Sequence, residues 1–253
     1  MFCYKLVAGV TTLIEIYRTG GIILAIQQLE VNNLDETGYA IDNGHVRAFL
    51  FIGEDKALLI DSGFGDYDID EWVRGLTDKP VMLVNTHTDG DHTGGNAKFE
   101  SVFMHPAEYA HYFEGSPANK NVHPLLEGDK IDIGGRIFEV ILIPGHTPGS
   151  ISFLDAENRI LVSGDSVSAV PVYMFGKARN IFAYIASMKR LDSMSDRFDT
   201  IYASHGQVFL EKGQIKKLIS AAESLVKGEI EGVDAPNNMP AKTYLKDGVG
   251  FYY

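Results

Sequence analysis

Two histidines and two aspartates fall within six residues of the segment Thr86-His87-Thr88-Asp89-Gly90-Asp91-His92-Thr93. Imidazole nitrogens and carboxylate oxygens are suitable ligands for Zn²⁺ and other divalent metal ions. A loop that bends at Gly90 can turn several of these donors toward one point. The spacing therefore indicates a metal site, and the alternative interpretation is a polar surface loop that holds histidines by chance.

Three later positions strengthen the metal interpretation. His146 lies in the turn Pro144-Gly145-His146-Thr147-Pro148-Gly149, where proline and glycine restrict the backbone around a ligand ring. Asp165 follows Ser163-Gly164, and His205 lies between Ser204 and Gly206. Each residue alone is more typical of a structural role, but four such sites in one chain are much less easily explained by chance.

The elements that must position these residues follow from the apolar pattern, which predicts short strands alternating with helices. Strands are expected over residues 46–52, 57–60, 81–84, 101–104, 136–143, 150–154, 159–163 and 200–203. Helices are expected over residues 70–76, 93–98, 106–113, 181–191 and 214–226. Most of the chemistry-bearing residues come just after a predicted strand, and polar groups at such strand ends converge on a crevice.

The ordered motifs resemble those of the metallo-β-lactamase superfamily. Its usual first motif is H-x-H-x-D-H, followed by a Gly-His-Thr-x-Gly turn, a Gly-Asp pair and a late histidine. The resemblance runs from about Val46 to His205 and includes the early strand and turn Leu58-Leu59-Ile60-Asp61-Ser62-Gly63. It implies an α+β fold, a four-layer αβ/βα sandwich of two mixed β-sheets flanked by helices.

The same resemblance implies two metal ions and assigns their ligands. The first ion would be held by His87, Asp89 and His146. The second would be held by Asp91, His92 and His205, with Asp165 bridging the two. Asp61 would stand behind the ligands and orient their rings, a common role for a carboxylate beside a metal-bound histidine.

Asp89 departs from the family pattern, which has histidine at this position. A carboxylate still binds Zn²⁺, but an oxygen donor shifts the preference toward harder ions such as Mn²⁺ or iron. The flavodiiron branch of the superfamily carries a glutamate here and binds iron. Three outcomes stay open: Asp89 coordinates the first ion directly, reaches it through water, or leaves the first site weak. We expect two divalent ions, zinc first, with iron or manganese as alternatives.

The function that the resemblance implies is hydrolysis of a small ester, thioester, lactone or related substrate by a metal-bound hydroxide, with Asp91 orienting the hydroxide. Tyr173 follows the bridging aspartate and is a candidate for contacting substrate, although packing explains it equally well. A diiron redox protein of the flavodiiron kind is the alternative class, but the chain has no room for a flavin domain. A phosphodiesterase is a further alternative, and nothing indicates recognition of β-lactams.

Composition limits the remaining possibilities. The chain has 253 residues, 22 Lys and Arg, 34 Asp and Glu, and a formal net charge of −12, so binding to nucleic acid phosphates is not expected. One cysteine excludes an internal disulfide and a cysteine-built zinc site. No long apolar run or signal peptide is recognised, which predicts a cytoplasmic protein with a small-molecule substrate and no membrane partner.

We expect one domain over residues 1–253, with its core over about 22–228 and a C-terminal arm or strand over 229–253. The sequence carries no signal for a particular oligomeric state.

Overall fold

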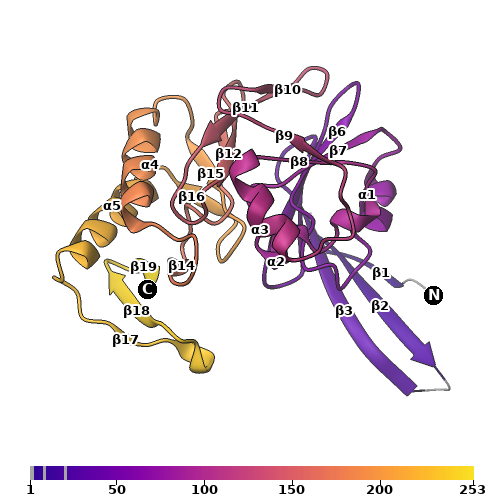
Figure 1. Cartoon of the computed structure of the whole chain (residues 1–253). Helices are drawn as coiled ribbons and strands as arrows, with labels where there is room; N and C mark the ends of the chain where they lie inside the picture. The colour runs from indigo at the N-terminus through magenta and orange to yellow at the C-terminus, as the bar shows by residue number, and fades with distance from the viewer. Residues whose placement is uncertain (1–2, 8–9, 20–21) are drawn as a thin grey trace. The chain divides into compact units, whose positions relative to one another are not determined.

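The computed structural model describes residues 3–7, 10–19 and 22–253, with side chains from residue 29 onward. The chain divides into two compact units (Figure 1). Unit 1 comprises Met1–Phe103, Gly115–His123 and Ile133–Gly135, and unit 2 comprises Met104–Glu114, Pro124–Asp132 and Arg136–Tyr253.

Unit 1 is built on a nine-stranded sheet in which each strand pairs with the next along the chain. Strands β1 to β6 form antiparallel pairs, and β6, β7 and β8 run parallel. The strands of this sheet are β1 Cys3–Val7, β2 Val10–Thr19, β3 Ile22–Asn33, β4 Gly38–Asp42, β5 Arg47–Ile52, β6 Ala57–Ile60, β7 Val81–Val84, β8 Val102–Met104 and β9 Val122–Pro124.

Unit 2 holds a six-stranded sheet in the order β10-β11-β12-β13-β15-β16 and a four-stranded sheet in the order β14-β19-β18-β17. The first comprises β10 Lys130–Asp132, β11 Ile137–Leu142, β12 Ile151–Asp155, β13 Ile160–Val162, β15 Thr200–Tyr202 and β16 Phe209–Glu211. The second comprises β14 Val172–Tyr173, β17 Val233–Asp234, β18 Lys242–Lys246 and β19 Val249–Tyr252. The smaller sheet was not predicted from the sequence.

The helices are short apart from two in unit 2. They are α1 Ile69–Leu76, α2 Gly90–Thr93, α3 Tyr109–Glu114, α4 Ile181–Ser193 and α5 Gly213–Val226, with 3₁₀ turns at Asn96–Lys98, Pro106–Glu108 and Pro236–Asn238. Helix α4 begins where the Asn180 side chain accepts hydrogen bonds from the amides of Phe182 and Ala183, both at 3.0 Å, a favourable N-cap. In the described part of the chain, none of the helices has the length and apolar character needed to cross a lipid bilayer.

Most predicted elements are confirmed, including the hairpins β5–β6 and β12–β13. The single helix predicted over residues 93–98 is replaced by two short elements, because helix α2 begins earlier, at Gly90, and stops at Thr93, and a 3₁₀ turn covers Asn96–Lys98. The reason is a contact from far along the chain: the amide of Gly94 donates to the carbonyl of Gly63 at 2.8 Å, so it does not continue the helix. As a result, Asp91 and His92 lie on the helix itself.

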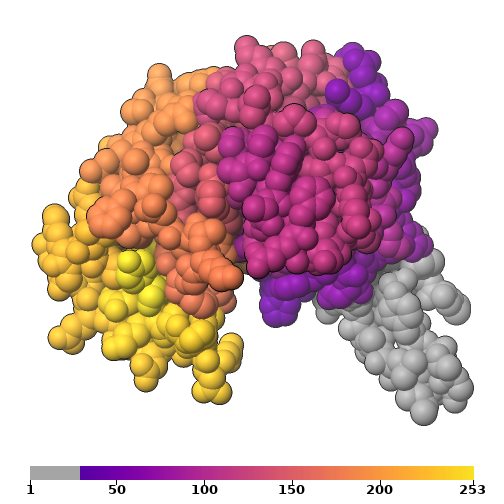
Figure 2. Space-filling view, in the orientation of Figure 1, coloured from indigo at the N-terminus to yellow at the C-terminus, as the bar shows by residue number. Residues whose placement is uncertain are grey.

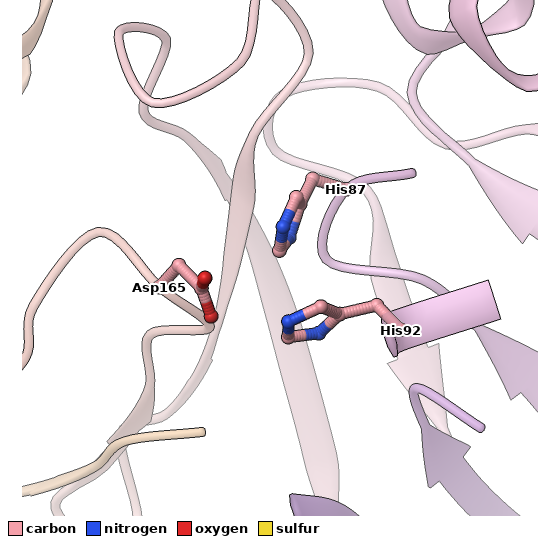
Figure 3. Close-up of side chains that lie close together, drawn as sticks. All are labelled: His87, His92 and Asp165. Carbon is pink, nitrogen blue, oxygen red and sulfur yellow. The ribbon is translucent and has the colours of Figure 1, made fainter. Parts of the chain in front are cut away.

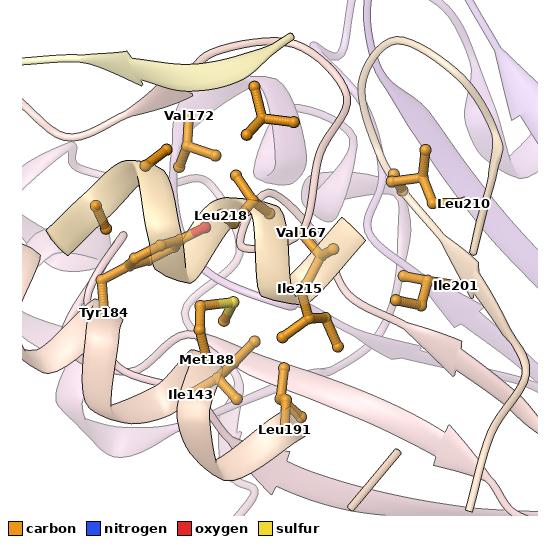
Figure 4. Close-up of a cluster of buried hydrophobic side chains, with 14 of the residues drawn as sticks. Ile143, Val167, Val172, Tyr184, Met188, Leu191, Ile201, Leu210, Ile215 and Leu218 are labelled. Carbon is orange, nitrogen blue, oxygen red and sulfur yellow. The ribbon is translucent and has the colours of Figure 1, made fainter. Parts of the chain in front are cut away.

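The core of unit 2 lies between its sheets and its two long helices. Tyr184, Met188 and Leu191 of α4 and Ile215 and Leu218 of α5 are buried together (Figure 4). The spacing of these apolar residues along each helix places them on one face, which explains why the amphipathic pattern predicted both helices correctly. The mixed sheets and their covering helices confirm the α+β fold class.

Strand direction decides where the candidate site residues emerge. Strands β6 and β7 are parallel, so Asp61 and the segment that leads to His87 leave the sheet of unit 1 at the same edge. In unit 2, β11 and β13 are both antiparallel to β12, and β15 is parallel to β13. Strands β11, β13 and β15 therefore share a direction, and the turns after them carry His146, Asp165 and His205 at one edge of the sheet.

Candidate functional site

In unit 1, His87 and His92 are both buried, and their rings lie beside each other (Figure 3). Their ring centroids are 4.1 Å apart, with an angle of 49° between the ring planes. His87 comes from the loop after β7, and His92 comes from α2. The two residues are only five positions apart, so local backbone geometry is enough to bring the two rings together.

Asp61 holds both histidines in position. Its carboxylate accepts a hydrogen bond from the amide of Thr86 at 2.8 Å and another from the hydroxyl of Thr86 at 2.8 Å. The same carboxylate lies 2.8 Å from Nδ1 of His92. Asp61 is fully buried and has a φ of 64°, a left-handed conformation that aspartate tolerates better than most residues. Its position at the end of β6 is therefore suited to this orienting role.

These contacts determine which ring nitrogens carry protons. A carboxylate only accepts hydrogen bonds, so Nδ1 of His92 is the protonated nitrogen. The hydroxyl of Thr86 already donates its one hydrogen to Asp61, and Nδ1 of His87 lies 3.0 Å from the same oxygen. His87 therefore donates from Nδ1 as well. Both rings keep Nε2 as the nitrogen that offers a lone pair.

In unit 2, a backbone carbonyl performs the same task for His146. Nδ1 of the buried His146 lies 2.8 Å from the carbonyl oxygen of Tyr173, which can only accept. The carbonyl of His146 itself accepts from the Arg179 guanidinium at 2.7 Å. Both contacts fix the ring, and the lone pair is again on Nε2.

The turn that carries His146 is tightly packed. Gly145 has a φ of +145°, and a Cβ atom there would come within 2.4 Å of the backbone of Tyr184, so only glycine fits. The amide of Gly149 donates to the buried carboxylate of Glu108 at 2.7 Å. Burial raises the pKa of Tyr184, so its hydroxyl stays protonated and donates to the carbonyl of Ser166 at 2.7 Å, just after Asp165.

Each of four histidine Nε2 atoms lies near a carboxylate oxygen of the same unit. In unit 1, Nε2 of His87 is 3.5 Å from Asp89, and Nε2 of His92 is 3.6 Å from Asp91. In unit 2, Asp165 lies 3.6 Å from Nε2 of His146 through one oxygen and 3.2 Å from Nε2 of His205 through the other.

These separations test whether the residues fit a metal ion. Two ligands bound at about 2.1 Å to a tetrahedral ion lie about 3.4 Å from each other. Three of the four distances exceed the usual range of a hydrogen bond between nitrogen and oxygen, and all four lie close to that spacing. The donor set of imidazole nitrogens and carboxylates suits a divalent metal of the first transition row. The residues fit a metal centre.

The remaining predicted residues have clear places. Tyr173 is 42% exposed, and its ring lies 5.6 Å from that of Phe175 and 5.0 Å from that of Tyr252. His105, expected to be structural, accepts from the amide of Ala107 at the start of a 3₁₀ turn, and burial lowers the pKa of His105. The structure does not bring His105 into the groups of metal-type donors among the described residues.

Sequence reasoning missed three residues that support the ligands, namely Thr86, Glu108 and the backbone of Tyr173. Thr86 directly precedes His87 and could have been suspected from that position. The other two act across long stretches of chain, 41 residues for Glu108 and 27 for Tyr173, and no local pattern signals them.

The profile of the metallo-beta-lactamase superfamily matches residues 41–216, which is well over half of the chain. The chain belongs to this superfamily. The matched range contains all seven metal-type donors and Asp61, and curated relatives of this chain are hydrolases. The sequence resemblance and the expected enzyme class are thereby confirmed.

Two curated relatives within the superfamily are thioester hydrolases. The acyl-coenzyme A thioesterase MBLAC2 of Gallus gallus is 30% identical over 186 residues, which cover 59% of this chain and 67% of the relative. The hydroxyacylglutathione hydrolase of a Synechococcus strain is 29% identical over 89 residues, 35% of each chain.

A solved metallo-beta-lactamase from Pontibacter korlensis has a TM-score of 0.63 and 18% identity over 88% of this chain and 99% of its own. At this identity the similarity shows the fold. It confirms the metallo-β-lactamase type of α+β fold that the motifs predicted.

A first prediction concerns Asp61. In Asp61→Asn, an amide replaces one of the two oxygens, so the donors on Thr86 and His92 no longer both find an acceptor. We expect the affinity for Zn²⁺ to fall about 10- to 100-fold, as is usual when a residue that orients a metal-bound histidine is lost. Competition with a chromophoric chelator measures this affinity. The exposed Asp78→Asn is the matched control, and equal affinities in the two variants would contradict the role of Asp61.

Proposed function

We propose that this protein is a dinuclear metal-dependent thioester hydrolase. The observation that carries the proposal is the set of four distances of 3.2–3.6 Å between histidine Nε2 atoms and carboxylate oxygens. A thioester is favoured over other substrates because both curated relatives described above cleave thioesters by name. Water is added across the bond between the carbonyl carbon and sulfur, which yields a carboxylic acid and a thiol.

The proposed centre holds two ions. The donor groups that could each hold one ion are His87, Asp89 and His146 for the first and Asp91, His92 and His205 for the second. Asp165 would bridge the two ions, since its two oxygens lie near two different histidines, His146 and His205. Asp89 would be a direct ligand, which its separation from Nε2 of His87 supports.

Charge supports two ions rather than one. Three carboxylates, those of Asp89, Asp91 and Asp165, belong to the proposed ligand set. The three histidines whose hydrogen bonds are described above already hold a proton on Nδ1, so they enter the centre neutral. Two divalent cations offset three carboxylates and leave one positive charge, which a hydroxide at the centre would neutralise.

When bound, a pair of divalent ions supplies a water molecule of lowered pKa and polarises the carbonyl of the substrate. The protein's own residues supply the geometry. The half-buried carboxylate of Asp91 would accept a hydrogen bond from that water and so orient it toward the carbonyl carbon. The exposed ring of Tyr173 and the half-buried ring of Phe175, beside the turn of His146, would contact the acyl part of the substrate.

A test of the activity uses Asp91→Asn. We expect the metal-loaded protein to hydrolyse acyl-coenzyme A or acyl-glutathione thioesters, and the variant to lose at least about 100-fold in kcat/KM because asparagine is a poorer acceptor. Release of free thiol, followed with a thiol-reactive dye, measures the rate. The exposed Asp78→Asn should keep the full rate.

The same assay on an ester, a lactone and a phosphodiester separates the substrate classes. A phosphodiester cleaved faster than every thioester would overturn the thioester proposal. Full thioesterase activity in Asp91→Asn would remove Asp91 from the mechanism while leaving the substrate class intact.

A second test concerns Asp89 and the choice of metal. An oxygen donor at this position favours Mn²⁺ or iron more than a histidine nitrogen does. We therefore expect Asp89→His to raise the ratio of Zn²⁺ affinity to Mn²⁺ affinity by roughly tenfold, the lower end of what one group of the ligand shell contributes. Asp89→Asn keeps the size and one oxygen and serves as the control. A ratio that is the same in all three proteins would show that Asp89 does not touch the metal.

The acid at position 89 also keeps a diiron redox protein as a second candidate, because iron accepts carboxylate ligands readily. Iron in the purified protein together with consumption of O₂ or NO, and without thioester hydrolysis, would favour that candidate.

A third prediction concerns stability. Asp89 and Asp91 stand two residues apart, and a bound cation would lower the repulsion between their carboxylates. Free metal at about 100 times its dissociation constant stabilises the folded chain by about 2.7 kcal/mol. We therefore expect verified metal removal to lower the melting temperature by about 5–10 °C for a chain of this size. An unchanged melting temperature would contradict the coupling between metal binding and folding.

A further inference from the structure

The segment that follows the family match forms part of a sheet of its own. Strands β17, β18 and β19 all lie beyond residue 216, where the match ends. They pair in the order β17, β18, β19, and β19 pairs in parallel with β14, the two-residue strand Val172–Tyr173. In Figure 2 this last part of the chain, in yellow, lies against the orange part of the same unit.

One peptide group connects β19 with a proposed metal ligand. The amide of Met174 donates to the carbonyl of Tyr252 in β19 at 2.8 Å. The carbonyl of Tyr173, on the other side of the same peptide bond, accepts from Nδ1 of His146 at 2.8 Å. A trans peptide is planar and its N–H and C=O point in opposite directions, so its orientation is held from both sides.

The two hydrogen bonds also strengthen one another. Donation from the Met174 amide to Tyr252 polarises the peptide group and makes the carbonyl of Tyr173 a better acceptor. A better acceptor holds the Nδ1 proton of His146 more firmly and leaves Nε2 as the nitrogen with the lone pair. The position of β19 thus bears on which nitrogen of His146 faces a metal.

Strand β14 depends on β19 for this geometry. It is two residues long, and in the described part of the chain its strand partner is β19. The side chains of Val172 and Met174, on either side of Tyr173, are buried in the core, and the peptide between Tyr173 and Met174 is hydrogen-bonded on both sides. The ring of Tyr252 lies 5.0 Å from the ring of Tyr173 and supports the same register.

Strand β19 is itself firmly placed. Phe251 is fully buried and its ring meets the ring of Tyr184 edge-on at 5.3 Å. A Cβ atom on Gly250 would come within 1.8 Å of the carbonyl oxygen of Tyr244, so β18 and β19 approach as closely as glycine allows. These contacts make β19 a rigid support.

We propose that β19 positions the ring of His146 through the peptide group between Tyr173 and Met174. This inference rests on the proposed function, in which His146 binds the first metal ion. Tyr252 and Met174 are positioning residues, and they act through their backbone groups rather than through their side chains.

The test removes Tyr252, the residue whose carbonyl accepts the hydrogen bond from the Met174 amide. Removal of Tyr252 and Tyr253 deletes the acceptor for the Met174 amide but keeps the buried Val249 and Phe251. Removal of Tyr253 alone is the matched control, because it breaks the hydrogen bonds of Tyr253 with Lys242 and leaves the oxygen of Tyr252 in place.

The readout is the tautomer of His146 in the metal-free protein, observed by ¹⁵N NMR of the imidazole rings at about pH 8.5, where histidine is neutral. We expect a single Nδ1–H form in the intact chain and in the control, and a mixture of tautomers in the doubly shortened chain. His92, whose Nδ1 is held by Asp61, is the internal reference and should not change. The Zn²⁺ affinity of the first site, to which His146 is assigned, should fall about tenfold only in the doubly shortened chain.

A second pair of variants repeats the test without shortening the chain. Met174→Pro removes the donating N–H, and proline favours an extended conformation in the preceding Tyr173, as β14 requires. Met174→Ala loses the same buried side chain but keeps the N–H, so it controls for packing. We expect mixed tautomers of His146 in Met174→Pro and one tautomer in Met174→Ala.

Three results would overturn the proposal. The first is an unchanged His146 spectrum in both the doubly shortened chain and Met174→Pro. The second is an equal change in the variants and their controls. The third is an equal change at His92, which would show a general loss of structure. The tautomer readout needs neither metal nor substrate, so a protein that passes this test but hydrolyses no thioester would refute the proposed function alone.

Discussion

The Nδ1 atoms of His87, His92 and His146 are each committed to an oxygen atom of the protein, and the rest of the site depends on this constraint. Once Nδ1 carries the proton, Nε2 is the nitrogen that can bind a metal, and the ring can no longer turn over. The three acceptors differ in kind: a threonine hydroxyl, an aspartate and a peptide carbonyl. All three are fixed by further hydrogen bonds, so the direction of each lone pair is set before any metal arrives.

The carboxylates impose the opposite constraint. Asp89, Asp91 and Asp165 place negative charge close to the ring nitrogens of His87, His92 and His146. Holding them in place costs free energy unless a metal ion binds. Close contacts hold the turn of His146 in place, such as the tight approach of Gly145 to Tyr184 and the hydrogen bond from the amide of Gly149 to Glu108. Stability and metal binding are therefore coupled in the proposed centre.

The two units solve the same positioning problem with different architecture. In unit 1, neighbouring parallel strands release Asp61 and His87 at one edge, and one carboxylate serves two residues of the loop. In unit 2, three strands of common direction release His146, Asp165 and His205. There the orienting acceptor is the carbonyl of Tyr173 in β14, a strand of a small sheet whose other three strands lie beyond the family match. In our proposal, the segment beyond residue 228 supports the orientation of the His146 ring, and its buried residues Val249 and Phe251 belong to the core.

The sequence by itself determined the family, the α+β class, most strands and helices and the set of candidate donors, because these follow from local spacing. His87 and His92 lie within one short segment, His146 lies in a glycine–proline turn, and Asp165 and His205 come just after apolar runs. It could not determine which ring nitrogen each histidine presents, where helix α2 ends, or that Tyr173 acts through its carbonyl rather than its ring. Those outcomes depend on partners 27 or more residues away, such as Tyr173 for His146, Gly63 for Gly94 and Tyr252 for Met174. Only tertiary structure decides them, because hydrogen-bond geometry between distant backbone groups leaves no trace in the order of the side chains.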